Sequence, residues 1–166
     1  LSVAAVNFPS AGITGDVQGY LYIGIGYPIP LEVFAAEWSD ADALKALLDS
    51  YNLPGVAFRT IHFKPFSGSL QGKLIHGVQF SSTTLTMSRL LQLTQFYVMQ
   101  AVNELYPERN PFALSKGRNN MFDKVCGTDY VRTTFGKRLK VEDIADYWSK
   151  DVEAFRTLSR KYWLYN

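Results

Sequence analysis

Residues that build disulfides and metal centres are scarce in this sequence. Among its 166 residues are one cysteine, Cys126, and two histidines, His62 and His76. A lone cysteine excludes an internal disulfide and a multi-cysteine zinc site, and the H-E-x-x-H pattern of zinc proteins is missing. The sequence also lacks a phosphate-binding G-x-x-x-x-G-K-[ST] loop. We therefore expect no metal and no cofactor.

Long apolar runs and an excess of charge of one sign are lacking as well. The sequence has 17 Lys and Arg against 15 Asp and Glu, a net charge of +2, whereas a nucleic-acid-binding domain needs a basic face. Residues 19–38 are mostly apolar, but Gly, Pro and Glu interrupt them, and a bilayer span needs ~18 apolar residues in a row. We predict neither a nucleic-acid partner nor a membrane span. No basic region precedes Leu1, so we expect no signal peptide in this chain, which reads as processed or truncated.

Apolar and aromatic side chains are what the sequence holds in quantity. Hydrophobic residues make up 47%, aromatic residues 14% and charged residues 19%. This balance excludes a disordered chain and, at this length, predicts one domain with a hydrophobic core. Flat aromatic rings serve a core, a sugar-stacking surface or an interface, and composition does not choose between these uses.

The start of the chain predicts an irregular segment followed by a strand. Residues 1–19 are small, polar and rich in glycine, which is typical of an irregular lead-in. Residues 20–25 alternate aromatic, Ile and Gly, which indicates a short strand. Pro28 and Pro30 each lack a backbone donor, so a central strand cannot continue through them.

A helix and two strands are expected next. Ser39, with Asp42 three residues later, forms a variant of the capping box and predicts a helix that ends at the segment N-L-P-G. Residues 56–63 and 74–80 alternate well enough to predict two strands. Gly77 interrupts the second strand, which indicates either a bulge or a close approach of backbones.

The rest of the chain predicts helices. Residues 88–105 carry an apolar stripe at helical spacing, and Thr128 is a candidate cap for a short helix through Phe135. In residues 141–163, apolar residues recur every three or four positions, which predicts a long amphipathic helix; they are Val141, Ile144, Trp148, Val152, Phe155, Leu158 and Tyr162. We therefore predict an α+β fold, in which helices pack on a small mixed β-sheet and a long amphipathic C-terminal helix ends the chain.

Motifs that resemble those of a known family follow one another along the chain. They are G-I-G-Y-P-I-P-L-E-V-F-A-A-E-W, N-L-P-G-V-A-F-R, F-K-P-F, G-V-Q-F, E-L-Y-P, F-D-K-V-C-G-T-D-Y-V-R and a terminal Y-W-L-Y. In this order and spacing they resemble the C-terminal part of the NamZ-type exo-β-N-acetylmuramidases, a bacterial family long known as a domain of unknown function. The likeness covers about residues 22 to 165.

The resemblance implies a role in turnover of the bacterial cell wall. Members of the family are exported hydrolases that remove N-acetylmuramic acid from the non-reducing end of peptidoglycan fragments. They combine an N-terminal Rossmann-like domain, which carries the catalytic acid, with a smaller C-terminal α+β domain. Residues 20–166 resemble the C-terminal domain, and the Rossmann-like domain is absent from this chain. The implied partners are muramyl saccharides or peptidoglycan fragments and the Rossmann-like domain of the same parent protein, and the implied location is periplasmic or secreted.

One motif departs from the family pattern S-x-G-R-G-T-x-x-P-F-x-x-x-G-A-P-W. Ile25 stands where the family has Arg between two glycines, and Ser159 stands where a later Arg is expected. A guanidinium can hold the lactyl carboxylate of muramic acid through two hydrogen bonds, and an isoleucine side chain cannot. The sugar specificity of this chain therefore stays open.

Gly24, Gly26 and Tyr27 are the first candidates for substrate binding. In one interpretation they end a strand at the sugar cleft, where glycines let the sugar approach the backbone and Tyr27 stacks on its ring. In the other interpretation they form a strand-to-turn connection whose glycines satisfy backbone geometry alone.

His62, His76 and Gln79 are further candidates for substrate binding. If the two strands that carry them pair antiparallel, His62 and His76 lie near one another. The residues then form a polar cluster that binds a hydroxyl or N-acetyl group. The alternative is two strand histidines without a ligand, one exposed and one held by a hydrogen bond.

Candidate catalytic residues are hard to find in this sequence. Glycoside hydrolysis normally needs two carboxylates ~5 to ~9.5 Å apart. Glu32 and Glu37 stand beside the Gly/Pro segment and are the carboxylates that we would test, although structural roles also explain them. Asp123 and Arg132 belong to a matched motif and predict an ion pair between C-terminal helices.

Two classes of function remain after these considerations. In the first, the chain is the accessory C-terminal domain of an exo-β-N-acetylmuramidase-like glycoside hydrolase, forms one wall of the sugar-binding cleft and is not catalytically competent alone. In the second, it is a stand-alone carbohydrate-binding or structural module without catalytic function, which Ile25 and the aromatic content favour. If the terminal aromatic residues dock on a missing domain, the isolated chain exposes an apolar patch.

Overall fold

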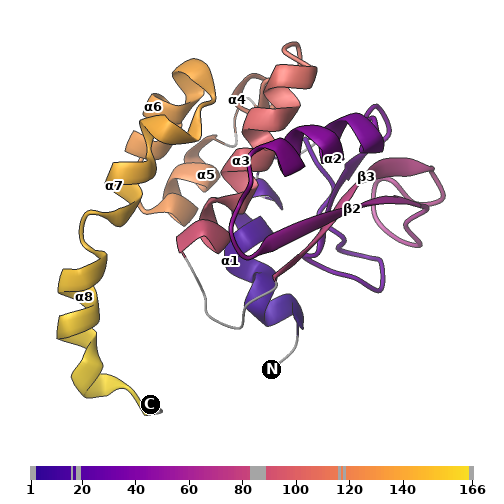
Figure 1. The fold of residues 1–166 in the computed structure, drawn as a ribbon. Helices are drawn as coiled ribbons and strands as arrows, with labels where there is room; N and C mark the ends of the chain where they lie inside the picture. The colour runs from indigo at the N-terminus through magenta and orange to yellow at the C-terminus, as the bar shows by residue number, and fades with distance from the viewer. Residues whose placement is uncertain are drawn as a thin grey trace.

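The computed structural model has the predicted α+β architecture, with a small sheet beside a larger group of helices (Figure 1). The structure describes residues 3–15, 17, 20–82, 89–115, 117 and 119–164. The strands are β1 (Val33–Ala36), β2 (Val56–Phe63) and β3 (Ile75–Ser82). The helices are α1 (Val3–Gly15), α2 (Ala41–Ser50), α3 (Arg89–Leu105), α4 (Pro111–Leu114), α5 (Asn119–Cys126), α6 (Tyr130–Arg138), α7 (Ala145–Ser149) and α8 (Val152–Ser159), with 3-10 turns η1 (Val141–Asp143) and η2 (Arg160–Tyr162).

The sheet has three strands in the order β1-β3-β2, so the strand that comes last in the sequence lies in the middle. Both neighbours of β3 run antiparallel to it, whereas a mixed sheet was predicted. The connection between β2 and β3 is too short for the crossover that a parallel pair requires. β2 occupies the predicted residues, and β3 occupies Ile75–Ser82 instead of 74–80.

Gly77 lies in the middle of β3, opposite Ala35 of β1 and Ile61 of β2. The pairing continues through this position without a bulge. A Cβ atom on Gly77 would overlap the carbonyl oxygen of Phe34, so a glycine here allows the backbones of β1 and β3 to approach. Of the two predicted roles of Gly77, the close approach is confirmed.

The prediction of a strand at residues 20–25 is wrong. Tyr22 forms one isolated bridge to β1, and the chain then turns back on itself. Gly24 and Gly26 have φ angles of 87° and 91°, which strand geometry does not allow. The alternation of aromatic and aliphatic residues in this segment reflects packing on the sheet instead.

Helix α1 stands where an irregular lead-in was predicted for residues 1–19. Its main partner is α3: Gln95 Oε1 accepts a hydrogen bond from the backbone N–H of Thr14 at 3.1 Å, and Gln95 Nε2 donates to the carbonyl oxygen of Pro9 at 2.8 Å. The small and polar residues of α1 give it no clear apolar stripe, so periodicity does not reveal the helix. Tertiary contacts hold it instead.

Helix α2 forms where it was predicted but begins one residue later than the capping-box interpretation placed it. Asp40 Oδ1 accepts hydrogen bonds from the backbone N–H groups of Asp42 and Ala43, both at 3.0 Å. Asp40 is therefore the N-cap. Ser39, the predicted cap, is left without that role.

The two faces of the sheet carry two apolar clusters, because successive side chains of a strand point to opposite faces. The larger cluster is the main core, which fills the space between the sheet and helices such as α2 and α3; its strand residues are Phe34, Ala36, Phe58, Val78 and Phe80. The smaller cluster lies on the opposite face and is covered by the chain before β1; its strand residues are Val33, Ala35, Phe63 and Ile75.

An ion pair joins α5 to α6, as predicted. Arg132 donates two hydrogen bonds to Asp123, from Nε to Oδ1 at 2.7 Å and from Nη2 to Oδ2 at 2.8 Å. Hydrogen bonding to this carboxylate raises the pKa of Arg132. Both side chains are largely covered, and a two-pronged pair of this kind fixes geometry as well as charge.

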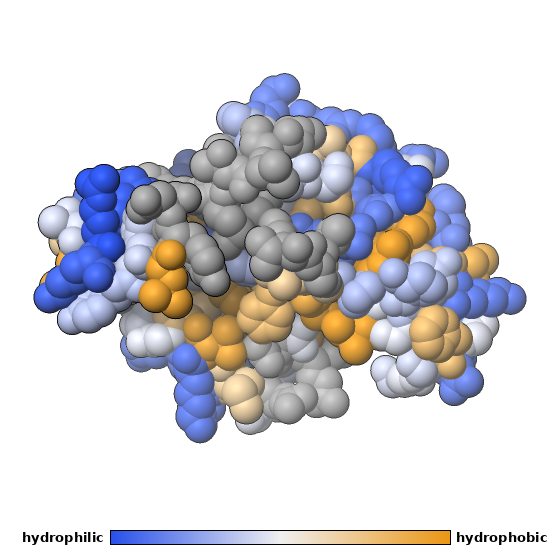
Figure 2. Space-filling model, turned by 90° about the horizontal axis from the view of Figure 1, so that it is seen from below, coloured by the Kyte–Doolittle hydropathy of each residue, from blue (hydrophilic) through white to orange (hydrophobic). Residues whose placement is uncertain are grey.

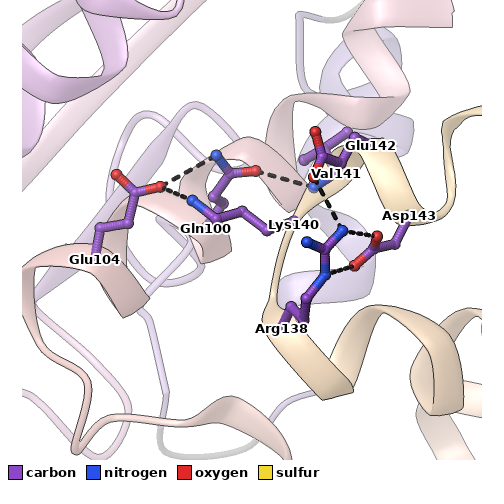
Figure 3. A network of polar contacts seen from close by, with 7 residues as sticks. All are labelled: Gln100, Glu104, Arg138, Lys140, Val141, Glu142 and Asp143. Carbon is purple, nitrogen blue, oxygen red and sulfur yellow. Dashed lines mark hydrogen bonds and ion pairs between the residues drawn. The ribbon is translucent and has the colours of Figure 1, made fainter.

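A polar network joins η1 to α3 (Figure 3). Gln100 Oε1 accepts from the backbone N–H of Val141 at 2.9 Å, and Gln100 Nε2 donates to Glu104 at 3.2 Å. Lys140 donates to the same carboxylate at 2.5 Å. Partial burial opposes the charged form of Glu104, but the donors Lys140 and Gln100 outweigh it and lower its pKa. Further members of the network are Arg138, Glu142 and Asp143.

The C-terminal segment is helical, as predicted, but the structure divides residues 141–163 into η1, α7, α8 and η2. Ile144 is fully buried, and Trp148 packs on Phe96 with 5.0 Å between ring centroids. The backbone leaves helical geometry at Asp151, with φ −111° and ψ 5°. Residues 150–164, here the C-terminal arm, then extend away from the body of the molecule (Figure 1).

No helix among the described residues is both long and apolar enough to cross a membrane.

Candidate functional site

The turn that contains Gly24 and Gly26 is explained by its own geometry. A Cβ on Gly24 would overlap the carbonyl oxygen of Ile29, and a Cβ on Gly26 would overlap Ser67 Oγ. Both glycines also have positive φ angles, which other residues rarely adopt. These contacts account for the two glycines without a ligand, and their role in sugar binding stays a prediction.

Tyr27 packs against the smaller apolar cluster. Its ring centroid lies 4.2 Å from that of Phe63 and 6.5 Å from that of Phe66. Tyr22 lies nearby and donates a hydrogen bond from its hydroxyl to the carbonyl oxygen of Ile25. Burial raises the pKa of Tyr22. Tyr27 thus has a packing role, and its stacking on a sugar ring stays a prediction.

Gln79 and Glu32 lie together in a polar chain on the sheet. Gln79 Nε2 donates to Glu32 Oε2 at 2.9 Å, and Arg59 Nε donates to Gln79 Oε1 at 2.6 Å. Gln79 and His76 are three positions apart on β3, so their side chains leave opposite faces of the sheet. The structure therefore separates Gln79 from the two histidines with which the sequence grouped it.

His62 and His76 are brought together, as the antiparallel pairing predicts. They are direct partners in the register of β2 and β3. Their Nδ1 atoms lie 2.8 Å apart, within hydrogen-bonding distance, and their ring centroids are 5.0 Å apart. One imidazole therefore donates at Nδ1 and the other accepts.

The two histidines line an open hollow at the N-terminus of α2, which we call the α2 hollow. Its volume is about 370 Å³. The remaining wall comes from the segment that links β1 to α2. The lining residues are Glu37, Trp38, Ser39, Asp40, Ala41, Asp42, His62 and His76.

Ser39 is the residue of the α2 hollow that sequence reasoning missed as a functional candidate. It is 5% exposed, and its hydroxyl has no hydrogen-bond partner within the described part of the chain. A buried hydroxyl without a partner is costly. In the sequence, Ser39 and Asp40 are adjacent residues that can each cap α2. Because Asp40 takes the N-cap position, the hydroxyl of Ser39 is left unused.

Trp38 and its neighbours form one side of the hollow. The Trp38 ring meets Tyr106 edge-on at 5.1 Å, and the Arg109 guanidinium lies over the ring at 5.0 Å. The Tyr106 hydroxyl accepts a hydrogen bond from the backbone N–H of Asp40 at 2.7 Å. These contacts tie the segment before α2 to the end of α3.

Glu37, one of the two candidate catalytic carboxylates, lines the α2 hollow, whereas Glu32 lies in the polar chain with Gln79. Glu37 pairs with Lys73 at 3.0 Å, and both side chains are about half exposed. Glu32 accepts from Gln79. Among the described residues, the buried polar side chains include no aspartate or glutamate. Glu32 and Glu37 thus have a glutamine and a lysine as their polar partners, and a catalytic role for either stays a prediction.

In the described ranges, no group of three or more His, Cys, Asp and Glu side chains is arranged to hold a metal ion.

Comparisons with known proteins agree with the fold and with the order of the motifs. A family model described as the C-terminal part of exo-β-N-acetylmuramidase NamZ matches residues 6–165. The chain is 33% identical over 153 residues to the peptidoglycan β-N-acetylmuramidase NamZ of Bacillus subtilis (strain 168), an alignment that covers 92% of this chain and 36% of that protein.

A solved structure is similar over nearly the whole chain. The crystal structure of a DUF1343 family protein from Bacteroides fragilis NCTC 9343 superposes with a TM-score of 0.91 at 44% identity, covering 98% of this chain and 42% of that one. The chain thus spans less than half the length of both relatives. From its motifs, its fold and these matches, the chain belongs to the family of NamZ C-terminal domains.

Proposed function

We propose that the chain is the accessory C-terminal domain of a peptidoglycan exo-β-N-acetylmuramidase-like glycoside hydrolase, and that it forms one wall of the sugar-binding cleft. Its relative in Bacillus subtilis is a peptidoglycan β-N-acetylmuramidase, and the chain corresponds to 36% of that protein. The remaining part of the enzyme is then the N-terminal Rossmann-like domain that the family resemblance implies.

The observation that carries this proposal is that the chain corresponds to 36% of a peptidoglycan β-N-acetylmuramidase. The described residues include no buried carboxylate, and Glu32 and Glu37 are engaged with Gln79 and Lys73. Cleavage of a glycosidic bond needs an acid and a second carboxylate held across the sugar. In this proposal the acids come from the N-terminal domain, and this chain supplies binding surface.

The C-terminal arm supports the presence of a partner domain. Its apolar side chains are exposed, Phe155 at 68% and Leu158 at 63%, and they recur at helical spacing on α8. A hollow of about 400 Å³ between α7 and α8 is lined partly by Trp148 and Phe155. Exposed apolar surface of this kind marks interaction sites, and the N-terminal domain is the proposed occupant.

The surface offers further apolar area for such a partner. On the face seen from below, apolar side chains gather across the middle, between hydrophilic side chains at the two sides (Figure 2). Ile25, which replaces the family arginine, is 56% exposed. An exposed isoleucine at this position suits contact with protein better than recognition of a lactyl carboxylate.

The proposal includes a location outside the cytoplasm. The substrate class, peptidoglycan, lies outside the inner membrane of bacteria, so the parent protein is expected to be exported. Fractionation of cells that produce the parent protein tests this part. Recovery from the periplasm or medium supports it, and recovery from the cytoplasm contradicts it.

Hydrolysis assays test the accessory role directly. The isolated chain is incubated with a chromogenic N-acetylmuramide, beside the Bacillus subtilis relative as the active control. We expect no turnover by the chain alone. Turnover comparable to that of the relative would refute the accessory role, because it would require a complete set of catalytic acids within this chain.

A stand-alone carbohydrate-binding module is the second candidate function. The α2 hollow favours it, because His62 and His76 place polar ring nitrogens in its wall. Titration with muramyl saccharides, followed by tryptophan fluorescence, separates the two functions. A module keeps its full affinity in isolation, whereas a cleft wall binds more tightly once the N-terminal domain is joined to it.

A further inference from the structure

Strand β2 lies at the end of the sheet with one edge unpaired. β3 pairs with one side of it, and the strand order β1-β3-β2 leaves the other side outermost. Among the described residues, no backbone hydrogen bond joins residues 57–63 to a group outside the sheet. We propose that this edge binds the same edge of a second copy of the chain, so that the two sheets form one continuous antiparallel sheet. This inference goes beyond the proposed function and does not depend on it.

The sequence of β2 lacks most of the features that keep edge strands apart. Natural edges are protected by proline, by lysine and other charges, by bulges or by short length. β2 has eight residues without proline or lysine, and it pairs with β3 along its whole length without a bulge. Its arginine, Arg59, is engaged with Gln79. At the other end of the sheet, Ala35 of the four-residue β1 exchanges two backbone hydrogen bonds with Tyr22. The β2 end is therefore the open one.

The symmetry of two identical edges restricts their register. Paired residues of an antiparallel sheet share a face, and their N–H and C=O groups point alternately to one side and to the other. Each β2 residue must therefore pair with one of the same parity in the copy, and the two-fold axis passes through a residue. An axis at Arg59 would place two arginines opposite one another, which is destabilising. An axis at Ile61 shortens the overlap, whereas an axis at Thr60 pairs residues 57–63.

Opposite charges meet at both ends of the edge in this register. A hollow of about 360 Å³ lies beside the start of β2; its lining residues are Leu48, Asp49, Asn52, Leu53, Val56 and Phe58. With the axis at Thr60, the copy's Lys64 lies opposite Val56, on the face that carries the hollow. Asp49 is 46% exposed and pairs with Lys45, and its two carboxylate oxygens can accept from a second cation. The two-fold axis repeats this contact, so the charges favour a second copy as the occupant.

Analytical ultracentrifugation of the whole chain tests this inference. We expect the mass to rise from monomer to dimer with concentration, because a contact between two strand edges is small and dissociates on dilution. Thr60→Lys places two like charges at the two-fold axis and should keep the chain monomeric. Gln71→Lys adds the same charge in the exposed loop between β2 and β3 and should dimerise as the wild type does. Circular dichroism checks that each variant is folded.

An exchange of charges tests the register and replaces Thr60→Lys if that variant fails to fold. Lys64→Asp and Asp49→Lys should each weaken the dimer about tenfold, because each change alters the contact at both ends of the edge. The double variant restores opposite charges and should regain the affinity of the wild type. If the two losses add in the double variant instead, the inference is overturned.

Three further results would overturn the inference. The first is a chain that stays monomeric at every concentration. The second is a Thr60→Lys variant that is folded and dimerises as the wild type does. The third is a dimer that Phe155→Asp abolishes and Thr60→Lys does not, because the copies would then associate through the C-terminal arm. The hydrolysis assay measures turnover and ultracentrifugation measures mass, so failure of the accessory role and failure of this dimer are told apart.

Discussion

The C-terminal segment contains two halves with the same sequence pattern and opposite surroundings. In the first half, Val141 and Ile144 are buried and Trp148 packs on the core. In the second half, Val152, Phe155 and Leu158 continue the same spacing but are exposed. Periodicity predicts which side of a helix is apolar. Periodicity does not tell what covers that side. In the second half, the chain's own core does not cover the apolar side chains.

The largest expected effect comes from the packed half. Ile144→Ala should lower the free energy of unfolding by about 2–5 kcal/mol, because it removes a fully buried side chain and leaves a cavity. The matched change in the arm, Leu158→Ala, should alter it by less than about 0.5 kcal/mol. Urea denaturation of the isolated chain measures both. Similar losses for the two variants would show that the arm packs as tightly as the body.

The ion pair between α5 and α6 extends the comparison from apolar side chains to charged ones, with a smaller expected loss of stability. Arg132→Ala should cost about 1–3 kcal/mol, because Asp123 is largely covered and loses its two-pronged partner. Arg156→Ala in the arm, whose partner Glu153 is exposed, should cost less than about 0.5 kcal/mol. Denaturation curves of both variants test the difference, and an Arg156 effect as large as that of Arg132 would contradict it.

Acid titration probes the network that anchors the packed half. The lowered pKa of Glu104 means that the folded state favours its charged form. This contribution is present above the ordinary carboxyl pKa, near 4.3, and is lost as the pH falls through the lowered value. The stability difference between the wild type and Glu104→Gln should therefore be largest near neutral pH and shrink on acidification. Parallel curves across this range would contradict the prediction.

The smallest expected effect on stability lies in the arm. Phe155→Asp should leave the free energy of unfolding within about 0.5 kcal/mol of the wild type, because the side chain is 68% exposed. Binding of a hydrophobic dye should decrease, since the apolar stripe is interrupted. Ala154→Asp adds the same charge beside the stripe and should retain more of the dye signal. Equal dye binding by all three proteins would count against an exposed apolar patch.

Elements with a plain apolar pattern on a shared core could be predicted from the sequence. β2 and α2 follow this rule, because alternation in one and helical spacing in the other both reflect burial in apolar clusters. α1 escaped prediction because it is held by Gln95 of α3, far away in the sequence. The false strand at residues 20–25 has the right alternation, but Gly24 and Gly26 turn the backbone.

The candidate site was predictable only in part. The contact between His62 and His76 follows from antiparallel pairing of two recognisable strands. The position of Gln79 on the other face follows from counting residues along β3, because side chains alternate between the two faces. The prediction that grouped Gln79 with the two histidines did not take this alternation into account. Ser39 became visible only with the structure, because the choice between two adjacent caps depends on the local geometry of Asp40.

The strand order has a consequence for how the protein is made. β1 and β2 lie on the two sides of β3, so neither finds its hydrogen-bonding partner until the last of the three strands has left the ribosome. Up to that moment the nascent chain carries two unpaired strands, whose open edges attract other chains. The interval before β3 emerges is therefore the one in which the edges of β1 and β2 lack the strand that later protects them.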